Sequence, residues 1–145
     1  MARKTEQLTI GHRRIALSNL VKVLYPGTKF KKADLLDYYV HVSKYILPHL
    51  KDHPITLKRF PDGVFGEAFY EKDAPAFTPS WVKTAPVPRR ETLGPDIQYI
   101  LINDLASLVW AANLASIELH PFLHRAGRLA RPTAIVFDCD PGRRR

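Results

Sequence analysis

Segments with helical spacing and segments with strand spacing of apolar residues follow one another along this chain. Their order limits the fold more than any single motif does. Apolar residues recur with helical spacing at 32–50 and 105–119. Alternating stretches joined by turn-forming residues lie at 5–17 and at 54–60 with 64–70. A helix buries its apolar stripe on a neighbouring layer, and hairpins supply antiparallel sheet. We therefore predict an α+β fold in which helices pack on β-hairpins within an antiparallel or mixed sheet.

The segments between these elements carry weaker signals. Residues 17–24 have apolar side chains at i, i+3, i+4 and i+7, which favours a short helix. Residues 73–96 contain five prolines, so we expect an irregular, mobile loop that Trp81 anchors. Residues 97–102 have the composition of a strand. The length suits a single domain over residues 1–145 with one hydrophobic core.

Two aspartates follow the last apolar run of the chain, Ala134 to Phe137. The β-branched and aromatic composition of this run predicts a buried strand, which Pro141-Gly142 ends. Because side chains alternate along a strand, Asp138 and Asp140 would share one face. Paired carboxylates repel each other unless a cation lies between them, and Mg²⁺ or Mn²⁺ prefers oxygen ligands. The motif indicates either a metal site for phosphoryl or nucleotidyl transfer, or a solvated turn at a strand end.

The charge balance favours a polyanionic partner. The chain has 22 basic and 14 acidic residues and a formal net charge of +8 at pH 7. Nucleic acid is the first candidate and an anionic membrane surface the second, although such a charge also serves solubility. The single cysteine excludes an internal disulfide framework and suits a reducing cytoplasm. No signal peptide or membrane-spanning run is visible, so we expect a cytoplasmic protein without a membrane partner.

A lysine cluster stands at the start of the helix predicted over 32–50 and includes Lys29, Lys31 and Lys32. Lysines oppose the dipole at a helix N-terminus. An arriving phosphate would relieve that repulsion and accept hydrogen bonds from the free N–H groups of the first turn. The alternative is a cluster of solvated lysines, and the sequence leaves both open.

Aromatic and basic residues are interleaved around the second hairpin. Phe69 and Tyr70 end its second arm, and Lys58, Arg59 and Lys72 lie close by in the sequence. Together they could form a stacking platform for a nucleic-acid base, with Lys58 and Arg59 contacting DNA. The alternative is that the aromatic rings cover the sheet or belong to the core.

Three further residues are candidates for a functional site. Arg89 and Arg90 form a basic tip in the proline-rich segment and could contact DNA. His120 comes at the end of the helix predicted over 105–119, and His120-Pro121 would end that helix. A histidine in such a place is either a structural residue or a catalytic one.

These segments together resemble the polymerase domain of DNA ligase D, which belongs to the archaeo-eukaryotic primase superfamily and acts in bacterial and archaeal non-homologous end joining. The similarity extends over residues 8–142 and is carried by an ordered set of blocks. These are Leu17–Pro26, Lys32–Tyr39, Lys58–Val64, Phe69–Lys72, Asp104–Trp110, Glu118–His120 and Val136–Gly142.

The resemblance implies a catalytic site at the end of the chain. Asp138 and Asp140 match the aspartates that bind the catalytic Mn²⁺ or Mg²⁺ ions. His120 matches a histidine beside the metal and the nucleotide. The implied reaction is metal-dependent addition of nucleotides to a 3′-OH from nucleoside triphosphates. Cys139 stands where an aliphatic residue is usual, and as a small apolar side chain it should be tolerated.

The resemblance also implies a DNA-end site. Asn19, Lys22 and Lys32 match the residues that bind the 5′-phosphate of a recessed DNA end with a 3′ overhang. Phe69 and Tyr70 match the aromatic residues that stack near the template base. The proline-rich loop corresponds to one that contacts DNA ends and supports their synapsis. Ku and the ligase and phosphoesterase domains are implied as partners, at the nucleoid of a prokaryotic cell.

The family's domain is longer than this chain. Its second half carries the third metal-binding aspartate and a phosphate-binding motif for the incoming nucleotide, and these have no counterpart within residues 1–145. We therefore expect the N-terminal portion of such a domain, which alone does not polymerise efficiently. The alternatives are a non-catalytic module that binds 5′-phosphorylated DNA ends, or a degenerate remnant that does not fold stably.

Overall fold

A computed structural model describes residues 5–91 and 93–142 of the protein. In this part of the chain two helices and nine strands form an α+β fold, as predicted. The helices are α1, Lys32–Leu50, and α2, Leu105–Asn113. The strands are β1 (Thr5–Ile10), β2 (Arg13–Ser18), β3 (Val23–Tyr25), β4 (Phe30–Lys31), β5 (Pro54–Arg59), β6 (Phe69–Glu71), β7 (Thr84–Val87), β8 (Ile97–Leu101) and β9 (Ser116–Pro121).

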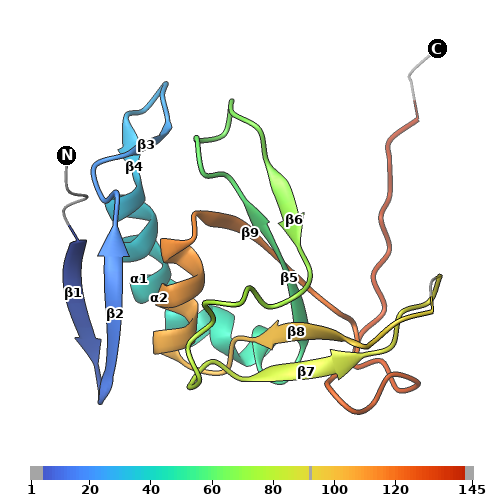
Figure 1. Ribbon diagram of the computed structural model, residues 1–145. Helices are drawn as coiled ribbons and strands as arrows, with labels where there is room; N and C mark the ends of the chain where they lie inside the picture. The colour runs from blue at the N-terminus through green and yellow to red at the C-terminus, as the bar shows by residue number, and fades with distance from the viewer. Residues whose placement is uncertain (1–4, 92, 143–145) are drawn as a thin grey trace.

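The main sheet is organised around β5. Strand β9 pairs antiparallel with β5 over Ile55–Arg59. On the other edge of β5, β8 pairs with Pro54 and Ile55, and β6 pairs with Leu57–Arg59. Strand β7 pairs with β8 at the edge of the sheet, which is where Pro86 is tolerated. All these pairings are antiparallel, and they bring residues from five distant segments onto one surface (Figure 1).

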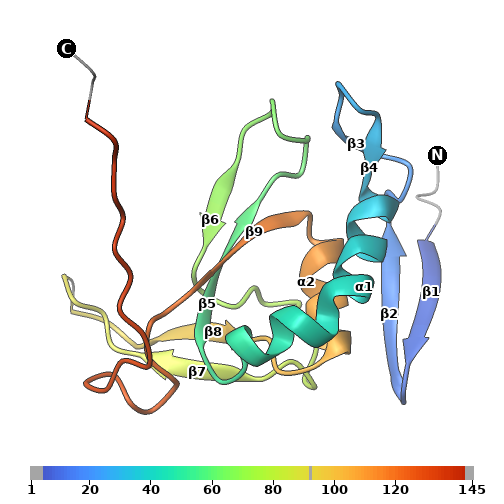
Figure 2. The same cartoon turned by 180° about the vertical axis from the view of Figure 1, so that it is seen from behind.

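The two helices lie side by side between the β1–β2 hairpin and the main sheet (Figures 1 and 2). Their apolar faces meet those of the sheet in a single core, where Leu24, Leu57 and Leu108 are fully buried. The hydroxyl of Tyr39 on α1 donates to the carbonyl oxygens of Ser116 (3.3 Å) and Ile117 (3.0 Å) on β9. Burial raises the pKa of this hydroxyl, so it remains a hydrogen-bond donor that ties helix to sheet.

The prediction of a helix over 17–24 is wrong. After β2 the chain turns at Asn19, which has φ +54°, and then forms the short strand β3. Asparagine tolerates this left-handed conformation, which interrupts a helix. Leu24 is buried as the helical spacing suggested, but it reaches the core from an extended backbone.

The helix predicted over 105–119 is too long. It begins as expected, because Asp104 caps it by accepting a hydrogen bond from the N–H of Ser107 (2.9 Å). It ends at Asn113, and Ala115 takes φ +58° before β9 begins. Residues 116–120 alternate in the manner of a strand, and pairing with β5 outweighs their helical propensity. His120 therefore lies on a strand rather than at a helix end.

The proline-rich segment 73–96 contains more regular structure than predicted. Strand β7 lies within it, and the N–H of Ala74 donates to the carbonyl oxygen of Gln98 (2.7 Å). Trp81 packs against the core, as expected of an anchor. In the hairpin before it, the arm predicted over 64–70 is shorter, since β6 covers only Phe69–Glu71.

The prediction of a strand over 134–140 is also wrong. These residues form no strand or helix, and Phe137 is 83% exposed. The segment extends away from the sheet in both views (Figures 1 and 2). In the described part of the chain no strand pairs with it, and its apolar composition has no layer to pack on. In the part of the chain that the structure describes, neither helix is both long and apolar enough to span a membrane.

Candidate nucleic-acid interface

A basic cavity of about 210 Å³ opens where β2, α1, β5 and α2 converge. Its walls bring together the three residues predicted to bind a 5′-phosphate, Asn19, Lys22 and Lys32. Arg59 of β5 and Asn113 at the end of α2 also line it. The cavity is several times the roughly 30 Å³ that a water molecule occupies, so it has room for a polar ligand.

Lys32 is the centre of this cavity. Its side chain is buried, with only 4% of the residue exposed, and its ammonium donates to the carbonyl oxygen (2.7 Å) and the hydroxyl oxygen (3.4 Å) of Ser18. Among the described residues no carboxylate lies within 4.0 Å of it. Burial, followed by the positive charges of Arg59 and Lys22, lowers the pKa of Lys32 to about 8. A buried, repelled ammonium of this kind is suited to receive an anion.

Two N–H groups in the first turn of α1 already have backbone acceptors. The N–H of Lys32 donates to the carbonyl oxygen of Lys22 (2.8 Å), and that of Ala33 donates to the carbonyl oxygen of Leu20 (3.0 Å). Asp34 accepts a hydrogen bond from the N–H of Lys31 (2.7 Å). Backbone carbonyls before the helix therefore already occupy two of the N–H groups that could meet a phosphate, and a phosphate contact with the helix start stays a prediction.

The other cations of the cavity have acidic partners. Lys22 pairs with Asp62 (2.7 Å) on the exposed rim, and Arg59 pairs with Glu71 (2.8 Å) across β5 and β6. The guanidinium of Arg59 also donates to the carbonyl oxygen of Leu114 (2.9 Å). These contacts fix the positions of Lys22 and Arg59 around the unpaired Lys32.

Asn113 was not predicted from the sequence. Its amide oxygen accepts a hydrogen bond from the N–H of Ser18 (3.1 Å), and its amide nitrogen donates to the carbonyl oxygen of Ala16 (2.9 Å). It thereby attaches the end of α2 to β2 beside the cavity. The only sequence signal was an asparagine at the true end of the helix, which the overlong helix prediction concealed.

A second charged surface lies over β6, β5 and β9. Tyr70, Lys58 and Glu118 are direct neighbours in the strand register, and His120 follows two residues along β9. Glu118 accepts hydrogen bonds from Lys58 (3.0 Å) through one oxygen and from His120 Nε2 (2.8 Å) through the other. The ring of Tyr70 meets that of His120 edge-on, with centroids 5.6 Å apart, and Lys58 lies 5.3 Å from the centre of the Tyr70 ring.

Phe69 and Tyr70 do not form one platform. As adjacent residues on β6 they point to opposite faces. Phe69 lies beneath the guanidinium of Arg59, 5.0 Å away, whereas Tyr70 lies beside Lys58 and His120. One base cannot stack on both rings in this arrangement, and template stacking stays a prediction for each of them.

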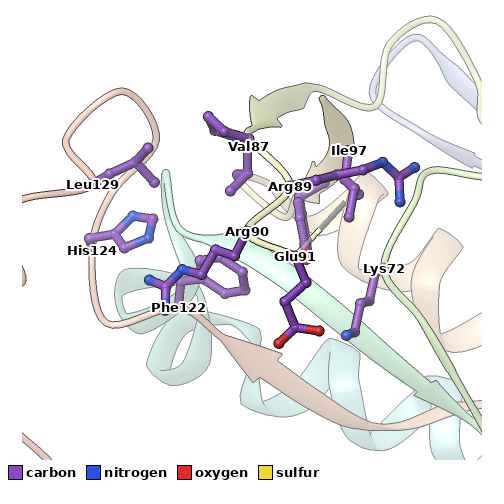
Figure 3. Close-up of a pocket in the computed structure, with 11 residues that line it drawn as sticks. Lys72, Val87, Arg89, Arg90, Glu91, Ile97, Phe122, His124 and Leu129 are labelled. Carbon is purple, nitrogen blue, oxygen red and sulfur yellow. The ribbon is translucent and has the colours of Figure 1, made fainter. Parts of the chain in front are cut away.

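Arg89 and Arg90 line a separate depression of about 580 Å³ between the β7–β8 connection and residues 122–129 (Figure 3). Lys72 and Glu91 also line it, and Phe122 and His124 form part of its wall. The guanidinium of Arg89 donates to the carbonyl oxygen of Pro95 (2.9 Å), which holds the connection in place. The two arginines predicted to contact DNA therefore lie in a basic hollow. This hollow shares no lining residue with the Lys32 cavity.

Asp138 and Asp140 are exposed and lie on the extended segment after residue 134. Their oxygen donors are of the right kind for Mg²⁺ or Mn²⁺. Within the described ranges, however, no three His, Cys, Asp or Glu residues are grouped so that they could hold a metal ion. The two aspartates therefore provide suitable ligands without a completed site. Cys139, which belongs to the strand predicted to be buried, is exposed as well.

Comparison with known proteins gives a consistent result. A family model for the LigD primase-polymerase domain matches residues 31–145. The multifunctional non-homologous end joining protein LigD of Mycolicibacterium smegmatis is 38% identical over 133 residues, which is 90% of this chain and 17% of that protein. The bifunctional LigD of Bacillus subtilis is 32% identical over 131 residues, or 90% of this chain and 20% of that protein.

A solved structure agrees with the family model and with the two LigD relatives. The polymerase domain of Mycobacterium tuberculosis ligase D, determined in complex with DNA, superposes with a TM-score of 0.73 at 38% identity, covering 77% of this chain and 38% of that one. The chain therefore belongs to the LigD primase-polymerase family of non-homologous end joining DNA repair. It spans about a fifth of the length of the two LigD proteins and less than half of the solved domain.

Proposed function

We propose that this chain is the DNA-end-binding part of an end-joining primase-polymerase. The Lys32 cavity would hold the 5′-phosphate of a recessed DNA end, with Asn19 and Lys22 as further ligands. The observation that carries this proposal is the buried ammonium of Lys32, which has neighbouring cations and no carboxylate within 4.0 Å in the described part of the chain. A phosphate would supply the missing negative charge, and charge-assisted hydrogen bonds to it are among the strongest in proteins.

The complete enzyme would add nucleotides to a 3′-OH opposite a template strand. Bound Mn²⁺ or Mg²⁺ would neutralise phosphate charge, and Asp138 and Asp140 would supply carboxylate ligands to it. Lys58 and His120 would contact the phosphates of a nucleoside triphosphate or of DNA, and Tyr70 would lie beside a base. Because the two aspartates are not joined by a third ligand within the described residues, we expect little polymerase activity from this chain alone.

The partners follow from the same proposal. DNA ends with a recessed 5′-phosphate and a 3′ overhang would bind the Lys32 cavity, and Arg89 and Arg90 would contact DNA from the second hollow. Nucleoside triphosphates, Ku and the ligase and phosphoesterase domains would act together with the complete protein in the prokaryotic cytoplasm, at the nucleoid. The homologous M. tuberculosis domain, whose structure contains DNA, supports the nucleic-acid part of this proposal.

A non-catalytic role for this chain is the second candidate. It is favoured by the contrast between a cavity whose walls are held by hydrogen bonds and an aspartate segment that is exposed. In that case the chain recognises 5′-phosphorylated ends without extending them.

The test is a binding titration of a labelled duplex with a recessed 5′ end, either phosphorylated or hydroxylated, at two salt concentrations. We expect tighter binding of the phosphorylated end, lost in Lys22→Ala and Lys32→Ala. Lys44→Ala is the matched control, because Lys44 lies on the exposed outer part of α1 next to Tyr45 and away from the cavity. Equal affinity for both duplexes would refute 5′-phosphate recognition. Primer extension by the parent chain would separate the polymerase from the non-catalytic module.

A further inference from the structure

We propose that Glu118 is a positioning residue. Its carboxylate holds the Lys58 ammonium on one oxygen and the His120 imidazole on the other, and so leaves Nδ1 of His120 free to meet a phosphate-bearing ligand. The inference about orientation stands on the geometry of this chain, whereas the identity of the ligand as a phosphate rests on the proposed function.

The register of the sheet produces this arrangement. Glu118 on β9 lies directly opposite Lys58 on β5, and His120 lies opposite Thr56, one pair further along the same two strands. Residues two apart on a strand share a face, so Glu118 and His120 point the same way. The carboxylate is thus placed between two groups that it can bind at the same time, at 3.0 Å and 2.8 Å.

The contacts determine which ring nitrogen of His120 carries the proton. Hydrogen bonds from Lys58 and then from His120 lower the pKa of the Glu118 carboxyl, so it is ionised at neutral pH and can only accept hydrogen bonds. The contact with Nε2 therefore requires a proton on Nε2. In the neutral ring Nδ1 is then unprotonated, and it is the nitrogen that Glu118 does not occupy.

The surrounding groups keep the ring in place. Tyr70 of β6 meets the His120 ring edge-on, and Lys58 lies over the Tyr70 ring. Lys58 is held by the same carboxylate, which raises its pKa mainly through that hydrogen bond and keeps it cationic. A phosphate at Nδ1 accepts a hydrogen bond from that atom in the ring that carries both protons, while Nε2 continues to donate to Glu118. Lys58 lies in the same row and supplies a second positive charge.

A simpler role for Glu118 would be charge compensation, in which it neutralises Lys58 and has no effect on the direction of His120. The two roles predict opposite effects of Glu118→Gln on anion binding. Removing a negative charge beside an anion site should strengthen binding if only the net charge matters. Binding should weaken if orientation matters, because the amide replaces one of the two accepting oxygens with an NH2 group that would face a donor.

The first measurement is the tautomer of His120, read from the ¹⁵N chemical shifts of its ring at pH 9, where an ordinary imidazole is neutral. We expect the ratio of the Nε2–H form to the Nδ1–H form to be about tenfold higher in the parent chain than in free histidine, as a charge-assisted hydrogen bond provides. In Glu118→Gln the ratio should fall towards that of free histidine. The matched control is Glu67→Gln, which removes the same charge from an exposed position in the β5–β6 connection and should leave the tautomer unchanged.

The second measurement is a titration with inorganic tripolyphosphate at pH 7, followed through the same ring signals. We expect Glu118→Gln to weaken binding about tenfold, the effect of losing one charge-assisted contact. An unchanged tautomer in Glu118→Gln, or tighter tripolyphosphate binding with the parent's tautomer retained, would overturn the positioning role. If the parent shows the expected tautomer but tripolyphosphate does not perturb His120, the positioning role is supported and the nucleotide part of the proposed function fails.

Folding is checked separately. If Glu118→Gln loses the cooperative thermal transition of the parent, Glu118→Asp replaces it, since the shorter carboxylate keeps the charge but cannot span both neighbours. The Nε2–H excess should fall in that variant too, and a full excess would contradict the proposal.

Discussion

The Lys32 cavity and the segment 134–140 hold the two sets of residues that the family resemblance assigns to DNA-end binding and to metal binding, yet they differ in construction. The cavity is surrounded by paired strands and two helices, and Asn113 and Arg59 tie its walls together by hydrogen bonds. The segment has exposed apolar side chains and no strand partner within the described residues. A motif therefore locates functional residues in the sequence, whereas their assembly into a site depends on the elements packed around them.

The largest difference between the packed sheet and the segment 134–140 should appear in the effect of substitutions on folding stability. Leu57 is fully buried on β5 between β6 and β9. Leu57→Ala should lower the free energy of unfolding by about 2–5 kcal/mol, because it removes buried methyl groups and leaves a cavity. Phe137→Ala should change it by less than about 0.5 kcal/mol, because the ring is already in solvent. Thermal or chemical denaturation of both variants measures this comparison, and a comparable loss in the two would contradict it.

Lys32 should matter for binding and little for stability. Lys32→Met should reduce the preference for a 5′-phosphorylated end roughly 10- to 100-fold, which corresponds to the loss of a charged hydrogen bond worth about 1.5–3 kcal/mol. Its melting temperature should stay close to that of the parent, because the folded chain no longer has to bury an ammonium beside Lys22 and Arg59. A parallel loss of binding and of cooperative melting would make Lys32 a structural residue instead.

Part of the fold and part of the Lys32 cavity could be predicted from the sequence. It identified α1, the first hairpin and β8, since turn chemistry and periodicity are local properties, whereas the family resemblance pointed to Asn19, Lys22 and Lys32 of the cavity. It missed β9 and Asn113, because strand pairing with β5 decided the end of α2 and is not visible in local propensity. It also misjudged 134–140, since an apolar run becomes a strand only where a partner strand is present.

The pH dependence of phosphate binding separates Lys32 from the other cations of the cavity. With a pKa of about 8, Lys32 is protonated at pH 7 and largely neutral at pH 9, so the affinity for a 5′-phosphorylated end should fall about tenfold over this range. The phosphate itself remains a dianion throughout. In the chain without DNA, folding stability changes with pH in the opposite direction to DNA affinity. The lowered pKa implies that stability rises as the pH increases from about 8 towards 10.5. Lys32→Arg should remove both pH effects, and their persistence would assign them to another group.

The smallest effects are expected in the exposed segment. Asp138→Asn and Asp140→Asn should leave both the melting temperature and the preference for a phosphorylated end unchanged in this chain, because neither side chain contributes to the core or to the Lys32 cavity. The comparison with Leu57→Ala and Lys32→Met makes the absence of an effect meaningful. A loss of end binding in either aspartate variant would place the segment at the DNA site already in this chain.

A titration of the ¹⁵N-labelled chain with a 5′-phosphorylated recessed duplex, followed by NMR with the 5′-hydroxyl duplex as the reference, tests the Lys32 cavity directly. We predict that the phosphate-specific shifts concentrate at Asn19, Lys22 and Lys32 and saturate together, while Asp138 and Asp140 show none. Phosphate-specific shifts centred on Asp138 and Asp140, or their absence from all three cavity residues, would contradict the claim that this chain contains a preassembled site for a 5′-phosphate.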